Sequence, residues 1–145
     1  MNEAEAAAIH SACTRLSLDY CYFADQGLMQ PFSELFASDG ELVVAGQSTV
    51  GPAAILKSLG GAAEVQTVHA ISNVRIDVRG ATEAAGTVYV TAYVAPKADG
   101  GATMGQITPM AVGRYEDVYR KTNEGWRFAR RAFVPLISQK APEPT

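Results

Sequence analysis

The hydrophobic pattern of the chain is helical in its first half. From Glu3 to Asp25 the apolar residues fall on one stripe at helical spacing, which predicts an amphipathic helix. Gly27 follows at the position of a C-terminal cap. A short second helix is expected over Met29 to Phe36. A third is expected to open at Gly51-Pro52, because proline is tolerated in the first turn of a helix, and to end at Gly60-Gly61.

The second half is rich in alternating polar and apolar positions, which are typical of strands. Strands are expected at Glu41 to Ala45, Val65 to Val78, Ala85 to Pro96, Met110 to Lys121 and Trp126 to Leu136. The last two are joined across Thr122-Asn123-Glu124-Gly125, which is a hairpin signal. Helices first and strands afterwards predict an α+β fold, with the helices packed on one face of an antiparallel sheet.

The length of the chain, 145 residues, is close to the commonest size of a single domain. The sequence shows no internal repeat and no domain boundary. We therefore expect one domain over residues 1–138. The remaining segment, Gln139 to Thr145, carries two prolines and is expected to be a disordered tail.

Composition and charge narrow the possible partners. Hydrophobic residues make up 48% of the chain and charged residues 19%, as in ordinary soluble globular proteins. The net charge of −3 argues against nucleic acid or an anionic membrane as a partner. No apolar run is long enough to span a bilayer. The acidic N-terminus does not resemble a secretory signal or a transit peptide.

Both cysteines, Cys13 and Cys21, fall in the first expected helix. Eight residues at the helical rise place them about 12 Å apart, which is too far for a disulfide within the chain. We therefore expect reduced thiols and a cytoplasmic location.

His69 is the histidine that falls inside a strand-like stretch, and Asp25 is its candidate partner. An unperturbed imidazole has a pKa of about 6.5 and can take or give a proton at physiological pH. A carboxylate bonded to its far nitrogen sets the tautomer and stabilises the charged ring, which makes a competent general base. The alternative for His69 is an ordinary core histidine. The alternative for Asp25 is a solvated residue in the turn before Gly27.

Strand alternation predicts which face of the sheet other candidate residues occupy. Strict alternation places Ile71 and Asn73 on the face of His69, although a single bulge would reverse part of that assignment. Arg130 and Arg131 are adjacent on the last strand and must point to opposite faces. The inward one needs an anion or several acceptors.

Tyrosine hydroxyls and a second histidine complete the candidates. The tyrosine hydroxyls could donate a hydrogen bond to a substrate oxygen. Alternatively, the rings could be buried in the core with only the hydroxyl reaching water. The residues are Tyr20, Tyr22, Tyr93 and Tyr115. His10, among small and polar residues near the N-terminus, is expected to be exposed.

The sequence lacks the motifs that mark zinc sites, nucleotide-binding loops and nucleophilic serines. There is no HExxH, no CxxC and no cluster of histidines with carboxylates, which argues against a protein-bound metal such as zinc. No GxGxxG follows a strand, no Walker loop is present, and no GxSxG marks a nucleophilic serine. Proton transfer by side chains, without a cofactor, remains.

Six motifs in a defined order resemble a known family and span nearly the whole chain: Tyr20 to Asp25, Leu35 to Gly40, Gly51 to Ile55, Val68 to Asn73, Gly113 to Asp117 and Gly125 to Arg131. In this order they look like the nuclear transport factor 2-like superfamily, and within it the SnoaL-like group. The resemblance implies a cone-like barrel in which three N-terminal helices pack against a strongly curved antiparallel or mixed sheet. It also implies a ligand pocket in the mouth of the cone and usually a dimer through the sheet.

The site pattern is similar to that of two enzymes of this superfamily, scytalone dehydratase and hexachlorocyclohexane dehydrochlorinase, which use an Asp–His pair. Asp25 and His69 occupy the two corresponding places. The arginine of the dehydrochlorinase falls on Arg131, which favours Arg131 over Arg130 as the inward one. The resemblance implies a cofactor-independent lyase or isomerase, with His69 as base, acting on a small hydrophobic, cyclic or aromatic substrate.

In that enzyme, Arg131 with Tyr20 or Tyr22 would stabilise negative charge on the substrate, and Tyr115 would also contribute to binding. The chain departs from its relatives in several places. Tyr20 stands where the dehydrochlorinase has a lysine, and Ala24 replaces a tyrosine of the dehydratase. The second histidine of the dehydratase has only Val112 nearby. The carboxylate base of the ketosteroid isomerase type falls near Val44, which disfavours that chemistry.

Other functions remain open, because one fold hosts many activities. The chain could be a non-catalytic ligand-binding module or the small subunit of a ring-hydroxylating dioxygenase, although the intact Asp25 and His69 pair argues against both. A pocket that only sequesters a hydrophobic metabolite is a third possibility. A homodimer or higher homo-oligomer is expected.

Overall fold

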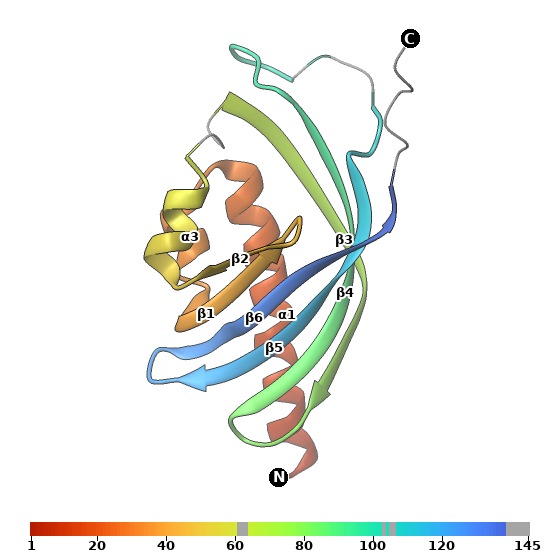
Figure 1. Cartoon of the computed structure of the whole chain (residues 1–145). Coiled ribbons are helices and arrows are strands. Elements are labelled where there is room, and N and C mark those ends of the chain that lie inside the picture. The colour runs from red at the N-terminus through yellow and green to blue at the C-terminus, as the bar shows by residue number, and fades with distance from the viewer. Residues whose placement is uncertain (61–63, 103, 105–106, 139–145) are drawn as a thin grey trace.

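A long helix, α1 (Glu3–Gln26), lies against the concave face of a curved sheet (Figure 1). The computed structural model describes residues 1–60, 64–102, 104 and 107–138. Asn2 caps the start of α1, because its side chain accepts from the Glu5 amide while the Glu5 carboxylate accepts from the Asn2 amide. Gly27 ends the helix in the left-handed conformation, with φ of 71°, which glycine adopts without a steric penalty.

The sheet has six strands in the order β2-β1-β6-β5-β4-β3. Their bounds are β1 (Phe36–Val44), β2 (Gln47–Val50), β3 (Val65–Val78), β4 (Glu83–Pro96), β5 (Ala111–Thr122) and β6 (Gly125–Ile137). β1 runs parallel to β6, and the other neighbouring strands are antiparallel, so the sheet is mixed. Two short helices, α2 (Met29–Ser33) and α3 (Pro52–Ser58), complete the fold. The expected α+β class is therefore confirmed.

The differences from the expected elements lie mainly around β1. The second helix ends at Ser33, because Phe36 already begins β1 and pairs with Phe128 of β6. β2 was not expected; it pairs with β1 across Ala45-Gly46, both of which have positive φ as a tight hairpin turn requires. The expected tail, 139–145, and Gly61 lie outside the described residues.

A bulge in β3 corrects the facing expected from strict alternation. The register with β4 shifts between Ser72 and Arg75, and Asn73 has a φ of 51°. Asn73 is consequently exposed, while Val74 and Ile76 pack on the core side together with Ile71. A single extra residue thus keeps both halves of a long strand facing α1.

The core fills the space between α1 and the concave face of the sheet. Buried residues of α1 such as Cys13, Leu16 and Tyr20 pack into one cluster with Tyr119 and Phe128 of the sheet. The N-terminus lies at one end of the molecule, and α2 and α3 lie towards the other (Figure 1). No helix within the described part of the chain is long and apolar enough to cross a membrane.

Candidate active site

Asp25 and His69 meet although they come from different elements. Asp25 lies in the last turn of α1 and His69 lies in β3. The distance from Asp25 Oδ1 to His69 Nδ1 is 2.6 Å, and both side chains are more than four-fifths buried. An ionised carboxylate can only accept, so Nδ1 must carry the shared proton when Asp25 is charged. Nε2, which has no hydrogen-bond partner among the described residues, is then the free basic nitrogen.

The Asp25 carboxylate receives further hydrogen bonds from β3. The His69 backbone amide donates to Oδ2 at 2.9 Å, and the Thr67 hydroxyl donates to Oδ1 at 3.0 Å. The Gln66 side-chain amide donates to the Asp25 backbone carbonyl at 3.1 Å. Hydrogen bonds to the charged form of a carboxylate favour that form, so this setting suits an anionic Asp25.

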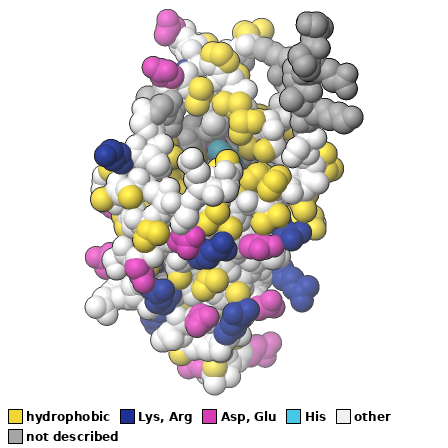
Figure 2. Space-filling model, in the orientation of Figure 1, with side chains coloured by type: hydrophobic (Ala, Val, Ile, Leu, Met, Phe, Trp, Pro, Cys, Tyr) yellow, Lys and Arg dark blue, Asp and Glu magenta, His cyan; other side chains and the backbone are white. Residues whose placement is uncertain are grey.

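A cavity of about 430 Å³ opens beside this pair. Six elements line it, namely α1, α2, β1, β2, α3 and β3, and His69, Thr67 and Tyr20 are part of its wall. The other lining residues are mostly apolar: Ala24, Met29, Phe32, Leu42, Val44, Ala45, Gln47, Thr49, Ser58, Leu59 and Val65. Figure 2 shows hydrophobic side chains around a hollow in the upper half of this face, with a histidine side chain visible inside. The volume and the apolar wall are typical of a small-molecule site.

Arg131 is the inward arginine and is fully buried, but it does not line the cavity. Its guanidinium is bound to the Asp117 carboxylate by two hydrogen bonds, of 2.8 Å and 2.9 Å, and Nη2 also donates to Ser17 Oγ at 2.7 Å. Nη1 has no hydrogen-bond partner among the described residues. Arg131 therefore lies behind the cavity wall, as half of a buried ion pair.

Three aromatic rings enclose the guanidinium. Its Cζ lies 3.9 Å from the ring centroid of Tyr115, 4.3 Å from that of Phe128 and 4.4 Å from that of Tyr20. These are cation–π distances. Burial lowers the pKa of Arg131, but the Asp117 charge and its hydrogen bonds outweigh this and raise it, so the guanidinium stays charged.

Tyr20 is the residue that connects the cavity with this buried cation. Tyr20 lines the cavity, and its ring also contacts the Arg131 guanidinium. The His69 and Tyr20 ring centroids are 6.4 Å apart in an edge-to-face arrangement. Burial raises the pKa of the Tyr20 phenol, although the Arg131 charge partly opposes the rise. The phenol therefore keeps its proton near neutral pH and can act as a hydrogen-bond donor.

The remaining candidates lie elsewhere. Tyr115 is buried behind Tyr20, with ring centroids 5.3 Å apart, and does not line the cavity. Tyr22 is 57% exposed on α1 and packs against Phe23, so its hydroxyl is not placed to meet a ligand in this cavity. Arg130 lies near Glu41 on the convex face. His10 is exposed, as expected.

Sequence reasoning missed the residues that hold the site residues in place. Thr67 lies two positions before His69, so strand alternation could have placed both on one face. Asp117, the partner of Arg131, depends on the register between β5 and β6. That register shifts between Val118 and Tyr119, which no sequence signal announces. Within the described residues, no group of three or more His, Cys, Asp and Glu side chains could hold a metal ion.

The chain belongs to the SnoaL-like domain family, whose model matches residues 5–132. This confirms the resemblance to the SnoaL-like group within the nuclear transport factor 2-like superfamily. No curated protein matches the sequence significantly.

Solved structures share the fold. A candidate scytalone dehydratase from Novosphingobium aromaticivorans has a TM-score of 0.80 and 24% identity, over 94% of this chain and 89% of that chain. A hexachlorocyclohexane dehydrochlorinase (LinA) Type2 has a TM-score of 0.72 and 17% identity, over 99% and 100%. A candidate aromatic ring hydroxylase from N. aromaticivorans has a TM-score of 0.75 and 22% identity, over 88% and 89%.

Proposed function

We propose that the chain is a cofactor-independent lyase or isomerase that removes a proton from a small hydrophobic, cyclic or aromatic substrate. His69 is the general base and Asp25 is its partner. The observation that carries the proposal is the 2.6 Å contact between His69 Nδ1 and Asp25 Oδ1 at the wall of an apolar cavity. The similarity in fold to a dehydrochlorinase and to a candidate dehydratase supports the same class of reaction.

In the proposed reaction, the free Nε2 of His69 takes a proton from a carbon beside a carbonyl or a leaving group. In an elimination, the C–H electrons form a double bond while the leaving group departs with its own electron pair. In an isomerisation, they pass to the carbonyl oxygen, and the proton returns at another carbon. Asp25 stabilises the imidazolium formed in either case. General base catalysis contributes about 10²–10⁴-fold, so positioning and electrostatics supply the rest.

Tyr20 is the proposed donor to the departing or enolising oxygen, because Tyr20 lines the cavity and burial raises the pKa of its phenol, which therefore keeps its proton. Arg131 acts on this oxygen through Tyr20, since the guanidinium contacts the Tyr20 ring, does not line the cavity and already gives two of its donors to Asp117. Tyr115 packs behind Tyr20 and supports its position. Tyr22, which points to solvent, has no role in this scheme.

The test is proton exchange at carbon, followed by NMR in D2O with a panel of cyclic ketones and cyclic β-hydroxy ketones. The proposal expects deuterium incorporation or elimination with the wild-type protein, and loss of both with His69→Ala. Asp25→Asn should be strongly impaired, and His10→Ala should match the wild type. Activity that survives in His69→Ala, with the fold intact, would show that the base is wrong.

A second candidate function is a binding module or the small subunit of a ring-hydroxylating dioxygenase. The similarity in fold to a candidate aromatic ring hydroxylase favours it. Purification from the native source separates the two functions. A stoichiometric iron–sulfur partner chain would support the subunit, whereas a homo-oligomer that turns over the ketone panel would support the enzyme.

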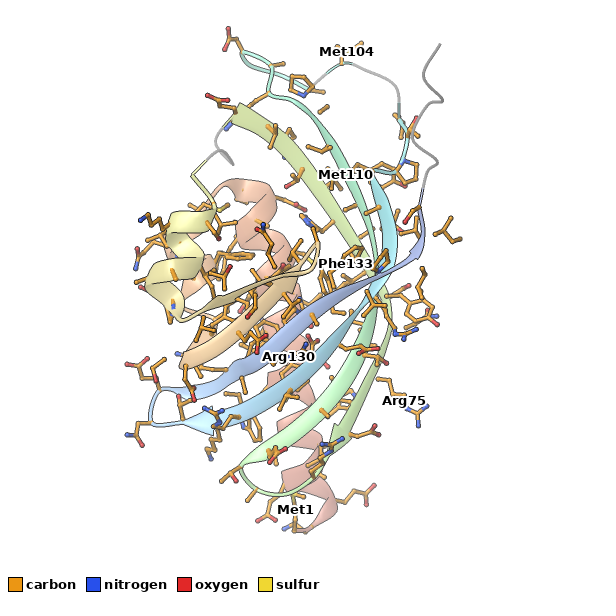
Figure 3. The ribbon with its side chains drawn as sticks, viewed as in Figure 1. Met1, Arg75, Met104, Met110, Arg130 and Phe133 are labelled. Atoms are coloured by element: carbon orange, nitrogen blue, oxygen red, sulfur yellow. The ribbon has the colours of Figure 1, made fainter. Side chains whose placement is uncertain are left out.

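We also infer a homodimer that forms through the convex face of the sheet. That face carries exposed Val68 and Tyr89, on neighbouring strands, and such apolar side chains gather at interfaces between subunits. Arg75, on the same face, points away from the helices (Figure 3). The free thiols of Cys13 and Cys21 support a reducing compartment such as the cytoplasm.

A further inference from the structure

Thr67 is a pocket residue to which the proposed chemistry gives no role. It precedes His69 by two positions in β3, and its hydroxyl donates to Asp25 Oδ1 at 3.0 Å. His69 Nδ1 lies 2.6 Å from that same oxygen. Thr67 and His69 therefore bond the same carboxylate oxygen, Asp25 Oδ1. Each of these two hydrogen bonds reduces the negative charge that is available to the other.

Counting donors and acceptors shows how completely the carboxylate is held. Oδ1 accepts from the Thr67 hydroxyl and the His69 ring, and Oδ2 accepts from the His69 backbone amide at 2.9 Å. An ionised carboxylate offers about four lone-pair positions, so three are used by two residues of one strand. The carboxylate cannot rotate without breaking bonds on both of its oxygens.

Gln66 holds the backbone of the same residue. Its side-chain amide donates to the Asp25 carbonyl at 3.1 Å and to the Thr67 carbonyl at 2.8 Å, which ties the end of α1 to β3. The last turn of α1 has no basic side chain to satisfy its carbonyls, so this amide takes that place. Asp25 is thereby fixed at both its backbone and its side chain before a ligand arrives.

We propose that Thr67 is a positioning residue of the Asp25–His69 pair, whose hydroxyl shares the charge on Oδ1 and so sets the basicity of the imidazole. Negative charge on Oδ1 that is neutralised by the hydrogen bond from the Thr67 hydroxyl is no longer available to stabilise the imidazolium. The bond therefore moderates the base while keeping the carboxylate anionic and the proton on Nδ1. The Asp25 carboxylate bonds the His69 ring directly, Tyr20 is the other titratable side chain in the described wall of the cavity, and the Cys21 thiol on α1 interacts with the Asp25 charge.

This inference rests on the proposed base, but its test needs no substrate. The sequence contains two histidines, so NMR of the ring nitrogens follows His69 with the exposed His10 as an internal reference. In the wild type we expect the neutral form of the ring to carry its proton on Nδ1, which faces Asp25 Oδ1. In Thr67→Val, the midpoint of the His69 titration should rise above that of the wild type, because a carboxylate that loses a donor interacts more strongly with the imidazolium.

Matched variants separate positioning from packing. Thr67→Ser keeps the hydroxyl and should restore the wild-type midpoint, whereas Thr67→Ala should behave like Thr67→Val. Thr91→Val, the same change on the adjacent strand and opposite face, should leave the His69 titration unchanged. A wild-type midpoint in both folded Thr67→Val and Thr67→Ala would overturn the inference. Turnover that survives His69→Ala would overturn the proposed function instead, and the NMR result would stand.

Discussion

The guanidinium of Arg131 and the carboxylate of Asp117 form a doubly hydrogen-bonded pair from which solvent is excluded on both sides. The two residues are paired across β5 and β6, and their side chains point toward α1, where Ser17 adds a third contact. Taking two charges out of water is costly, and such a pair is retained when its geometry and remaining hydrogen bonds compensate. Removing one partner of the pair should therefore destabilise the fold strongly.

The first prediction concerns this pair. Asp117→Asn should lower the free energy of unfolding by about 3 kcal/mol, because it leaves the Arg131 charge buried without its counterion. Urea denaturation followed by circular dichroism measures the change. Asp39→Asn breaks an ion pair with Arg120 that lies in solvent, so it should leave the urea midpoint almost unchanged. Equal midpoints for the two variants would mean that the buried pair contributes little.

The second prediction concerns the two thiols. Burial raises the pKa of Cys13 to about 12, with a further contribution from Asp117. Burial also raises the pKa of Cys21 to about 11, against the lowering effect of Arg131. Neither forms a thiolate near pH 8, so iodoacetamide should leave the native protein unmodified and alkylate both residues in urea. Mass spectrometry measures the result, and rapid native alkylation would contradict it.

The same thiols predict a loss of stability at high pH. Unfolded cysteines lose their protons near the ordinary value of 9.0, while the folded ones keep theirs to about 11 and 12. Between these values the unfolded state binds fewer protons, so the free energy of unfolding falls as pH rises above about 9. Urea titrations at increasing pH measure the slope, and Cys13→Ala should make it shallower. A flat profile would contradict the prediction.

The third prediction separates the Tyr20 hydroxyl from its ring. Tyr20→Phe keeps the aromatic face over Arg131 and removes the proposed donor. On a substrate identified with the ketone panel, kcat should fall by about 10²-fold, the effect of removing one donor to a developing oxyanion, while KM changes little. Tyr22→Phe, on the exposed face of α1, is the matched control and should retain full activity. Equal activity of the two variants would remove Tyr20 from the scheme.

The fourth prediction concerns the convex face of the sheet. Val68→Glu and Tyr89→Glu each place a charge on the proposed dimer interface and should convert the dimer into a monomer. Light scattering after size-exclusion chromatography measures the mass. Val50→Glu, at an equally exposed valine of β2, should leave the dimer intact. A wild-type protein that is already monomeric would exclude this interface.

The periodic parts of the fold could be predicted from the sequence, because long elements repeat their signal many times. The 24-residue α1 and the 14-residue β3 are examples. β2, with four residues, is too short to show a period. The parallel pairing of β1 with β6 joins segments that are far apart in the chain, and no local pattern encodes it.

Irregularities of the strands limited what could be predicted for the site. A regular ladder continued from Thr122 and Gly125 would place Arg130 opposite Asp117, and the register shift after Tyr119 puts Arg131 there instead. The inward facing of Arg131 was expected from a family resemblance and its need for an anion from burial, whereas the identity of that anion, Asp117, was not predicted. The bulge at Asn73 likewise reassigns the far half of β3. Each depends on one extra residue whose cost is recovered only in the folded sheet.

Different helices and strands supply different parts of the cavity wall. Tyr20, Thr67 and His69 come from α1 and β3, while other parts of the wall come from the β1–β2 hairpin, through Val44, Gln47 and Thr49, and from Ser58 at the end of α3. β2 lies at the edge of the sheet and, among the strands of the described residues, pairs with β1 alone. Mutations in this hairpin can therefore change the shape of the cavity while the Asp25–His69 pair stays intact. Size and polarity of the cavity can thus change through the hairpin independently of the residues on α1 and β3.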